Sequence, residues 1–130
     1  MLGKGLALVA GVLLLALSCG DIHQAPYGSK LTMPTGGDIS SSTDMVFVVS
    51  ALVLGPDAQP IDNVDVEFYV CCGGVQFAEG GTETTIKSDK TGVATVNVLI
   101  PGTYEGDISV TASIGIDSGE TKITKKIPSI

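Results

Sequence analysis

The sequence contains no tryptophan and no arginine, and only 5% of its 130 residues are aromatic. Without arginine, the planar side chain that binds phosphate through two parallel hydrogen bonds is missing. The formal net charge is −7, whereas proteins that bind nucleic acid concentrate basic side chains on one face. The shortage of aromatic residues also leaves no platform on which bases or sugars stack. We therefore expect no nucleic-acid partner and interpret the acidity as a contribution to solubility.

Residues suited to catalysis are also scarce. The one histidine, His23, has no evident partner in the sequence for a catalytic triad. The hydroxyl-rich run 40–43 lacks the Gly-x-Ser-x-Gly turn that exposes a nucleophilic serine. Asp65, Glu67 and Glu105 are carboxylates, but no aromatic residues accompany them to hold a sugar for glycoside hydrolysis. We predict that the protein is not an enzyme and uses no cofactor.

Three acidic residues fall near one expected loop end, where β-sandwich domains sometimes bind Ca²⁺. Asp57, Asp62 and Asp65 do not follow the spacing of a Ca²⁺-binding loop. We interpret them as solvated turn residues and predict no metal site.

The first residues have the layout of an export signal. Lys4 precedes an uncharged apolar run, 6–17, which is shorter than the roughly 20 residues of a membrane span and is typical of a cleaved signal peptide, here residues 1–18. The following Ala16-Leu17-Ser18-Cys19 resembles the lipobox of bacterial lipoproteins, although Ala16 stands where leucine is commonest. The pattern also fits the small-x-small site of the ordinary signal peptidase, and both readings place the cleavage before Cys19.

The lipobox resemblance implies that Cys19 carries lipid and that the membrane is a partner through this N-terminal lipid. Several buried acyl chains hold a protein stably on a bilayer, whereas one holds it weakly. The expected location is the bacterial cell envelope. Because Asp does not directly follow Cys19, the resemblance favours the outer membrane.

Beyond the leader, the composition predicts a linker followed by one β-rich domain. Residues 19–43 are rich in Gly, Ser, Thr and Pro and are interpreted as a tether, with a short first strand expected at 29–33. Residues 44–130 show short β-branched runs separated by turn residues and no amphipathic helix pattern. The class predicted is all-β, an immunoglobulin-like antiparallel β-sandwich of about seven strands.

The individual strands are expected from alternation and from turn chemistry. The expected strands are 45–54, 64–70, 82–87, 93–99, 107–114 and 120–127. Val75–Gly81 is expected to be a loop, and Ser88–Gly92 a hairpin turn with Gly92 at positive φ. The run 45–54 shows no clean alternation, which indicates cover on both faces. If one face proves uncovered, it is a candidate contact surface, and an exposed sheet edge could bind a partner by strand addition.

Several of these segments are similar to the invasin/intimin-type bacterial immunoglobulin-like domain. The resemblance covers about residues 44–127 and includes Gln59 to Phe68, the turn Ser88–Gly92 followed by Val93-Ala94, and Asp107 to Ser113. Ala58 and Asn63 replace glycines of the family pattern, but asparagine tolerates the left-handed conformation better than most residues. The resemblance implies a sandwich domain with a structural, spacer or protein-binding role of the adhesion type.

A second resemblance leaves an alternative open. Pro101-Gly102-Thr103-Tyr104 looks like the turn of transthyretin-like or carboxypeptidase-regulatory-like sandwiches. That resemblance implies an accessory subunit of a larger surface assembly for secretion, adhesion or electron transfer.

The neighbouring residues Cys71 and Cys72 form the most unusual local motif. Adjacent residues of a regular strand point to opposite faces, whereas a disulfide needs Cβ atoms about 3.8 Å apart. Gly73-Gly74 follows and would permit the distorted turn that a bond between neighbours requires. Three alternatives remain: a disulfide between Cys71 and Cys72, two free thiols with Cys72 buried, or an intermolecular disulfide.

Overall fold

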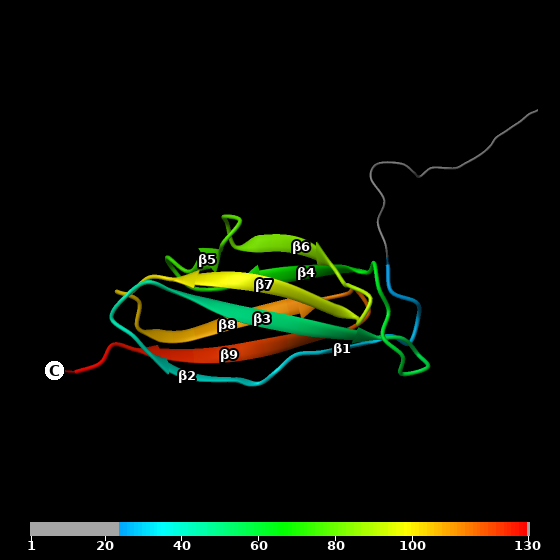
Figure 1. The fold of residues 1–130 in the computed structure, drawn as a ribbon, viewed down its shortest axis with the longest axis horizontal. Coiled ribbons are helices and arrows are strands. Elements are labelled where there is room, and N and C mark those ends of the chain that lie inside the picture. Colours follow the sequence, from blue (N-terminus) through cyan, green and yellow to red (C-terminus); the bar gives the residue numbers. More distant parts are fainter. Residues whose placement is uncertain (1–23, 130) are drawn as a thin grey trace, which may run out of the picture.

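The computed structural model describes residues 24–129, which form nine β-strands and no helix. Two sheets stack face to face (Figure 1), and the buried core draws side chains from both of them. The described residues contain no helix of the length and apolarity needed to cross a membrane. The expected signal peptide 1–18, the expected lipidation site Cys19 and His23 lie outside the described residues. The predicted all-β sandwich is confirmed.

The first sheet has four strands in the order β1-β3-β7-β5. Its strands are β1 (Lys30–Thr32), β3 (Met45–Leu54), β5 (Gln76–Phe77) and β7 (Val93–Ile100). The pairs β1–β3, β3–β7 and β5–β7 are all antiparallel. We call this four-stranded sheet sheet A.

The second sheet, sheet B, has five strands in the order β2-β9-β8-β4-β6. Its strands are β2 (Gly36–Ser40), β4 (Asp65–Val70), β6 (Glu83–Lys87), β8 (Gly106–Ser113) and β9 (Ser118–Lys126). Three of its pairs are antiparallel, but β2 runs parallel to β9. The expectation of a wholly antiparallel sandwich is therefore corrected at this one pair.

Alternating side chains from both sheets fill the core. In β4, Val66, Phe68 and Val70 are buried, whereas Glu67 and Tyr69 face solvent. The inward residues of the longer strands β3, β7 and β8 pack against them from both sheets. This burial of apolar side chains is the main favourable contribution to folding, at about 25 cal/mol per Å² of apolar surface. The period-two pattern predicted from the sequence is confirmed for β4 and β8.

Two strands escaped the sequence prediction. β2 has the sequence GGDIS, with one apolar residue and no buried position, so it carries no alternating signal. It is held by backbone pairing with β9. β5 is a two-residue strand inside the segment expected to be a loop, and it pairs with β7. Since β1 and β2 both lie within 19–43, the segment interpreted as a tether contributes strands to both sheets.

The turn Ser88–Gly92 forms, but it does not close a hairpin. Asp89 Oδ1 accepts hydrogen bonds from the Thr91 and Val93 N–H groups at 2.9 and 3.0 Å, and Gly92 has a φ of 81°. The strands on either side belong to different sheets, because β6 pairs with β4 and β7 pairs with β3. The hairpin prediction is therefore wrong: the turn links the two layers of the sandwich, a relation that local turn chemistry does not specify.

The prediction that β3 is covered on both faces is also wrong. Its second half buries alternate residues, but in its first half Val46 and Val48 are 54% and 58% exposed. Both valines point away from the core on the outer face of sheet A. The continuous apolar run therefore has a partly uncovered outer face.

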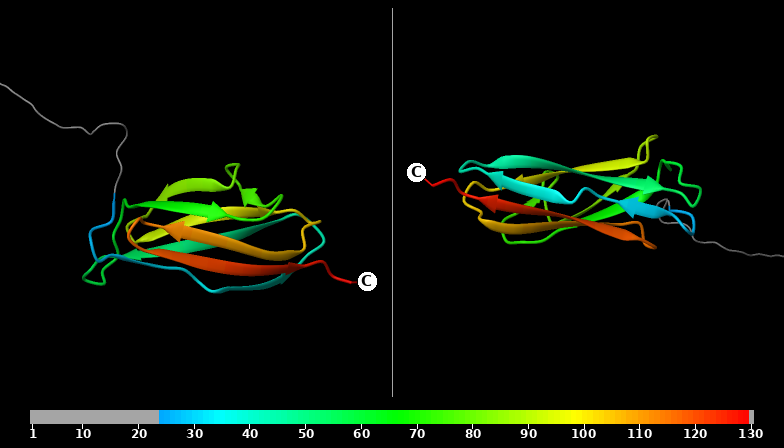
Figure 2. Two further views of the ribbon diagram at one scale, coloured as in Figure 1. Left: turned by 180° about the vertical axis from the view of Figure 1, so that it is seen from behind. Right: turned by 90° about the horizontal axis from the view of Figure 1, so that it is seen from below.

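The two described ends of the chain lie at opposite ends of the sandwich (Figure 2). At the N-terminal end, Gly28 lies against Pro56 of the β3–β4 loop. At the other end, the N–H of Ile127 donates to Glu105 Oε2 at 3.3 Å, in the β7–β8 loop. A tether attached at the N-terminus would therefore leave the β7–β8 end farthest from its anchor.

Candidate interaction surfaces and the cysteine pair

The cysteine pair lies directly after β4. The structure joins Cys71 Sγ to Cys72 Sγ in a disulfide, which is one of the three alternatives that the sequence left open. The Cys71 N–H donates to the Ser109 carbonyl oxygen at 3.1 Å, and the Ser109 N–H donates to Cys71 Sγ at 3.3 Å. Cys72 Sγ lies 3.4 Å from the Asp107 carbonyl oxygen. Both cysteines are thereby held against β8 and are partly exposed.

The backbone at the cysteine pair leaves the strand conformation. Cys72 has a φ of 94°, a region that non-glycine residues rarely occupy. The N–H of Val75 donates to the Cys72 carbonyl oxygen at 3.1 Å and closes the turn into β5. This segment contains Gly73-Gly74, the pair expected from the sequence to permit a distorted turn. Gly74 has a φ of 87°.

An apolar groove lies beside this turn on the outer face of sheet A. Its volume is about 400 Å³, and its lining includes Val46, Leu99 and Pro101, together with Gly74 and Gln76 from the cysteine turn and β5. Val46 and Leu99 are register partners on adjacent strands. The groove therefore joins the exposed face of β3 to the cysteine turn at the end of the sandwich far from the N-terminus.

A buried lysine holds the loops at this same end. Lys125 in β9 is 0% exposed. Its Nζ donates to the carbonyl oxygens of Ser41, Gly102 and Tyr104 at 2.9, 3.1 and 2.9 Å. An ammonium group has three donors, and all three are used. The β2–β3 and β7–β8 loops are thereby tied to β9.

Sequence reasoning did not single out Lys125, although a signal was present. Along β9, Thr121, Ile123 and Lys125 alternate with exposed residues and share the inward face. A lysine in phase with a buried isoleucine indicates a charge directed into the sandwich. Such a charge requires compensating polar partners, and here backbone carbonyls supply them.

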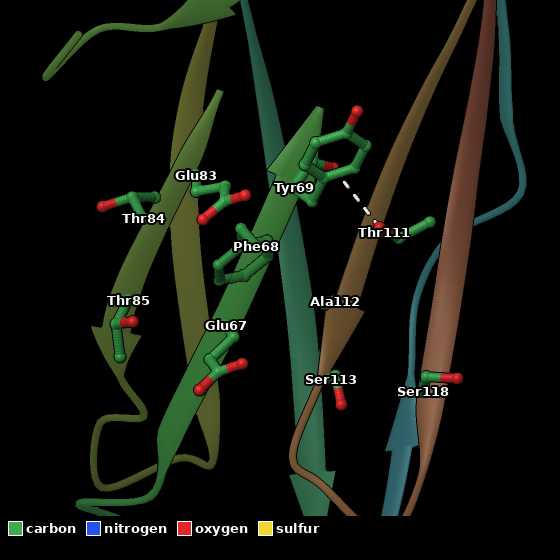
Figure 3. Close-up of a pocket in the computed structure, with 10 residues that line it drawn as sticks. All are labelled: Glu67, Phe68, Tyr69, Glu83, Thr84, Thr85, Thr111, Ala112, Ser113 and Ser118. Atoms are coloured by element: carbon green, nitrogen blue, oxygen red, sulfur yellow. Dashed lines mark hydrogen bonds between the residues drawn. The ribbon is translucent and has the colours of Figure 1, made fainter. Parts of the chain in front are cut away.

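A hollow of about 600 Å³ lies on the outer face of sheet B (Figure 3). Glu67 of β4 and Glu83 of β6 contribute carboxylates, and Thr84, Thr85 and Thr111 are among the hydroxyls around them. The lining residues include no histidine, cysteine or lysine. The hollow is therefore an open surface on which two carboxylates lie among hydroxyl groups.

Two of the three acidic residues considered for Ca²⁺, Asp57 and Asp65, have local roles. Asp57 Oδ1 accepts a hydrogen bond from the Gln59 N–H at 3.1 Å within the β3–β4 loop. Asp65 forms an ion pair with Lys87 of the neighbouring strand at 2.7 Å. Within residues 24–129, no three His, Cys, Asp or Glu side chains gather in a group that could hold a metal ion.

Two turn carboxylates accept hydrogen bonds that lower their pKa values. A hydrogen bond from the Thr91 hydroxyl, together with one from the Val93 N–H, lowers the pKa of Asp89 below its ordinary value. The N–H of Leu31 in β1 donates to Asp117 Oδ2 at 2.9 Å. This bond is the main cause that lowers the pKa of Asp117. Asp117 lies in the β8–β9 turn of sheet B and therefore links it to sheet A.

Comparison of the sequence with protein-family profiles and with characterised proteins finds no match. Among solved structures, the chain is similar to the D00-D0 domain of intimin, with a TM-score of 0.53, 14% identity, and coverage of 90% of this chain and 54% of that one. Salmonella alpha-2-macroglobulin reacted with methylamine matches with a TM-score of 0.54, 16% identity, and coverage of 88% and 7%.

Domains 4 and 5 of the S-layer protein SbsC match with a TM-score of 0.50, 13% identity, and coverage of 73% of this chain and 44% of that one. The chain therefore spans less than two thirds of each of these three structures. At such low identity the likeness concerns the fold alone. Together with the two stacked sheets, it shows that the described residues form an immunoglobulin-like β-sandwich.

Proposed function

We propose that this protein is a lipid-anchored module of the bacterial cell envelope whose immunoglobulin-like sandwich has a structural, spacer or protein-binding role. The observation that carries the proposal is the leader ending in Ala16-Leu17-Ser18-Cys19 ahead of a β-sandwich. Cys19 serves in this proposal as the attachment point. The exposed valines of β3 and the apolar groove beside them are the surfaces offered to a protein partner.

The geometry of the sandwich supports an orientation in which the apolar groove lies away from the membrane. The described chain enters at the end of the molecule that contains the β3–β4 loop, and the groove lies near the other end. The ten residues of β3 span about 33 Å at roughly 3.3 Å per residue. An anchor at Cys19 would thus hold the groove well above the membrane surface, within reach of other envelope proteins.

Membrane fractionation tests the anchor. The Cys19→Ala variant should move from the membrane to the soluble fraction and should lose incorporation of radiolabelled palmitate, because no thiol remains to be acylated. The matched control is Cys71→Ser/Cys72→Ser, which removes two thiols but leaves Cys19, and it should stay in the membrane fraction. Continued membrane association of Cys19→Ala would refute the lipid anchor.

A second candidate function is an accessory subunit of a larger surface assembly. The exposed apolar valines of β3 favour it, because an apolar surface of this kind is typical of proteins with a partner. Native electrophoresis after mild detergent extraction separates the two candidates. A discrete complex much larger than the monomer indicates an assembly subunit, whereas the monomer alone indicates a spacer.

A further inference from the structure

The first half of β3 has a strand neighbour on one side only. β1 pairs with Leu52–Leu54, the last three residues of β3. The chain then leaves sheet A, and its next strand, β2, pairs with β9 in sheet B. Residues 45–51 therefore pair with β7 alone. Figure 1 shows β1 beside one end of β3 and β2 continuing along the other sheet.

The register determines which backbone groups face this open edge. The Val53 N–H donates to the Gly92 carbonyl oxygen at 2.7 Å, on the β7 side of β3. In an antiparallel pair, alternate residues direct both N–H and C=O toward the same neighbour. Odd-numbered residues of β3 thus bond toward β7. Val46, Val48 and Ser50 direct their N–H and C=O groups toward the open edge.

A groove lies along this edge. Its volume is about 370 Å³, and it is lined by Phe47, Val48 and Val49 of β3, by residues 34–39, and by Thr121 of β9. On the far side of the groove, the backbone of β2 already pairs with β9. The groove thus leaves space beside β3 where one more extended strand would align.

The charge pattern distinguishes this edge from the others. Soluble proteins protect open strand edges with charged residues or by keeping the edge strand short. β6 carries Glu83 and Lys87, β2 carries Asp38, and β5 is only two residues long. β3 carries no charged residue in ten positions and exposes two valines.

We propose that the open edge of β3 at Val46–Ser50 binds an extended segment of another protein as an added strand of sheet A. Backbone hydrogen bonds would provide affinity, and alternate apolar side chains beside Val46 and Val48 would provide specificity. Asp38 lines the groove and Asp44 precedes the strand. Because these carboxylates attract positive charge and repel negative charge, we expect the bound segment to contain lysine and no acidic residue. A second copy of this chain is a poorer occupant, because each copy has a charge of −7. The inference rests on the proposed protein-binding role.

Two proline variants test the open edge without any partner. Proline removes an N–H and is tolerated in a strand only where that group faces away from the ladder. Val48→Pro should keep a cooperative thermal transition close to that of the wild type, because its N–H faces the open edge. The matched variant Val49→Pro should lose that transition, because its N–H bonds β7. Equal damage from both variants would overturn the proposal.

Peptide titration of the purified full chain, followed by NMR, tests the occupant. The probe is the capped peptide Lys-Val-Thr-Val-Thr-Val-Lys. Binding should slow hydrogen exchange at Val46, Val48 and Ser50, while the same peptide methylated on every backbone nitrogen should not bind. A glutamate-for-lysine peptide should bind at least threefold more weakly. Absence of binding, equal binding of the methylated peptide, or binding at the β6 edge would each overturn the proposal.

Protein variants complete the test. Val48→Lys should weaken peptide binding at least tenfold, whereas Thr85→Lys, which adds the same charge to the exposed strand β6, should leave it unchanged. A homodimer of the wild type that Val48→Pro abolishes would assign the edge to a second copy and overturn the proposal.

Failure of peptide binding in a chain that Cys19 still anchors contradicts this inference alone. Peptide binding by a chain that needs no Cys19 for membrane association contradicts the anchor alone.

Discussion

Lys125 places a full positive charge in the interior, and three backbone carbonyls surround it. None of these acceptors is a carboxylate, so the ammonium is compensated by dipoles and by hydrogen bonds. Gly102 lies close enough to the β2–β3 loop that a Cβ there would stand 2.6 Å from the Ser42 carbonyl oxygen. The lysine thus ties together two loops that already pack tightly.

Replacing Lys125 with methionine should destabilise the protein. Lys125→Met keeps most of the apolar stem but leaves buried carbonyl groups without a donor, and each such loss costs about 1–3 kcal/mol. We expect the free energy of unfolding in urea to fall by about 3 kcal/mol. The matched control is Lys126→Met, which removes an exposed neighbour and should change stability by less than about 0.5 kcal/mol. Similar losses in both variants would contradict the interior role of Lys125.

The cysteine pair leads to a second prediction at the residue scale. A disulfide between neighbours closes a very short loop, so it constrains the unfolded chain little. Reduction should raise the intact mass by two hydrogens and change the free energy of unfolding by about 1 kcal/mol or less. Mass spectrometry and urea denaturation, each with and without a phosphine reductant, provide the measurements. Alkylation of both cysteines in unreduced protein would show that the bond does not form.

Among the elements, β2 depends most on its neighbour. Its residues are half-buried or exposed, so apolar burial contributes little, and its place follows from pairing with β9. Gly36 at its start has a φ of 95°, and a Cβ there would stand 1.8 Å from the Lys122 carbonyl oxygen. The close approach of two backbones at this point requires glycine.

Adjacent glycines in β2 provide a matched pair of variants. Gly36→Ala should lower the free energy of unfolding by about 2 kcal/mol or more, because it combines an unfavourable φ with a clash against β9. Gly37→Ala meets no atom within 4 Å and should be neutral or slightly stabilising. Thermal denaturation of both variants measures the difference. Equal effects would contradict the parallel pairing of β2.

The elements also show how far a single sequence predicts this fold. Strands with alternating burial, such as β4, were predicted because their pattern reflects one buried and one solvated face. β5 and β2 were missed because pairing with a distant strand stabilises them, and pairing leaves no local signature. The sequence did not show that the first half of β3 has an exposed outer face and an unpaired edge. An apolar run has the same composition whether or not other segments pack on its face or pair with its edge.

At the scale of the whole molecule, acid should weaken the association of the two sheets. The folded-state pKa of Asp117 is lowered chiefly by the Leu31 N–H, and that of Asp89 by Thr91. The unfolded chain therefore takes up these protons first as the pH falls. The stabilisation that these carboxylates provide is complete above the ordinary aspartate pKa of about 4. It is lost as the pH falls through the lower folded-state values.

Asparagine variants isolate this contribution. Asp117→Asn and Asp89→Asn should each flatten the decline in unfolding free energy between about pH 5 and about pH 2, and both should be somewhat less stable than wild type at neutral pH. Asp38→Asn removes the same charge outside these turns and serves as the control. Urea titrations at a series of pH values measure the slopes. An unchanged slope in Asp117→Asn would show that its carboxylate does not couple the sheets.

The sequence by itself determined the class of this protein, because alternation of side chains and turn residues are local properties of the chain. It also supported the prediction of an export leader before Cys19, and it left the state of Cys71 and Cys72 open. Tertiary structure alone decided that β2 runs parallel to β9, that the Ser88–Gly92 turn connects two sheets, and that three backbone carbonyls surround the Lys125 ammonium. It also decided which half of β3 lacks a neighbour. Each of these features depends on segments distant in sequence, whose pairing follows from the packing of the whole sandwich.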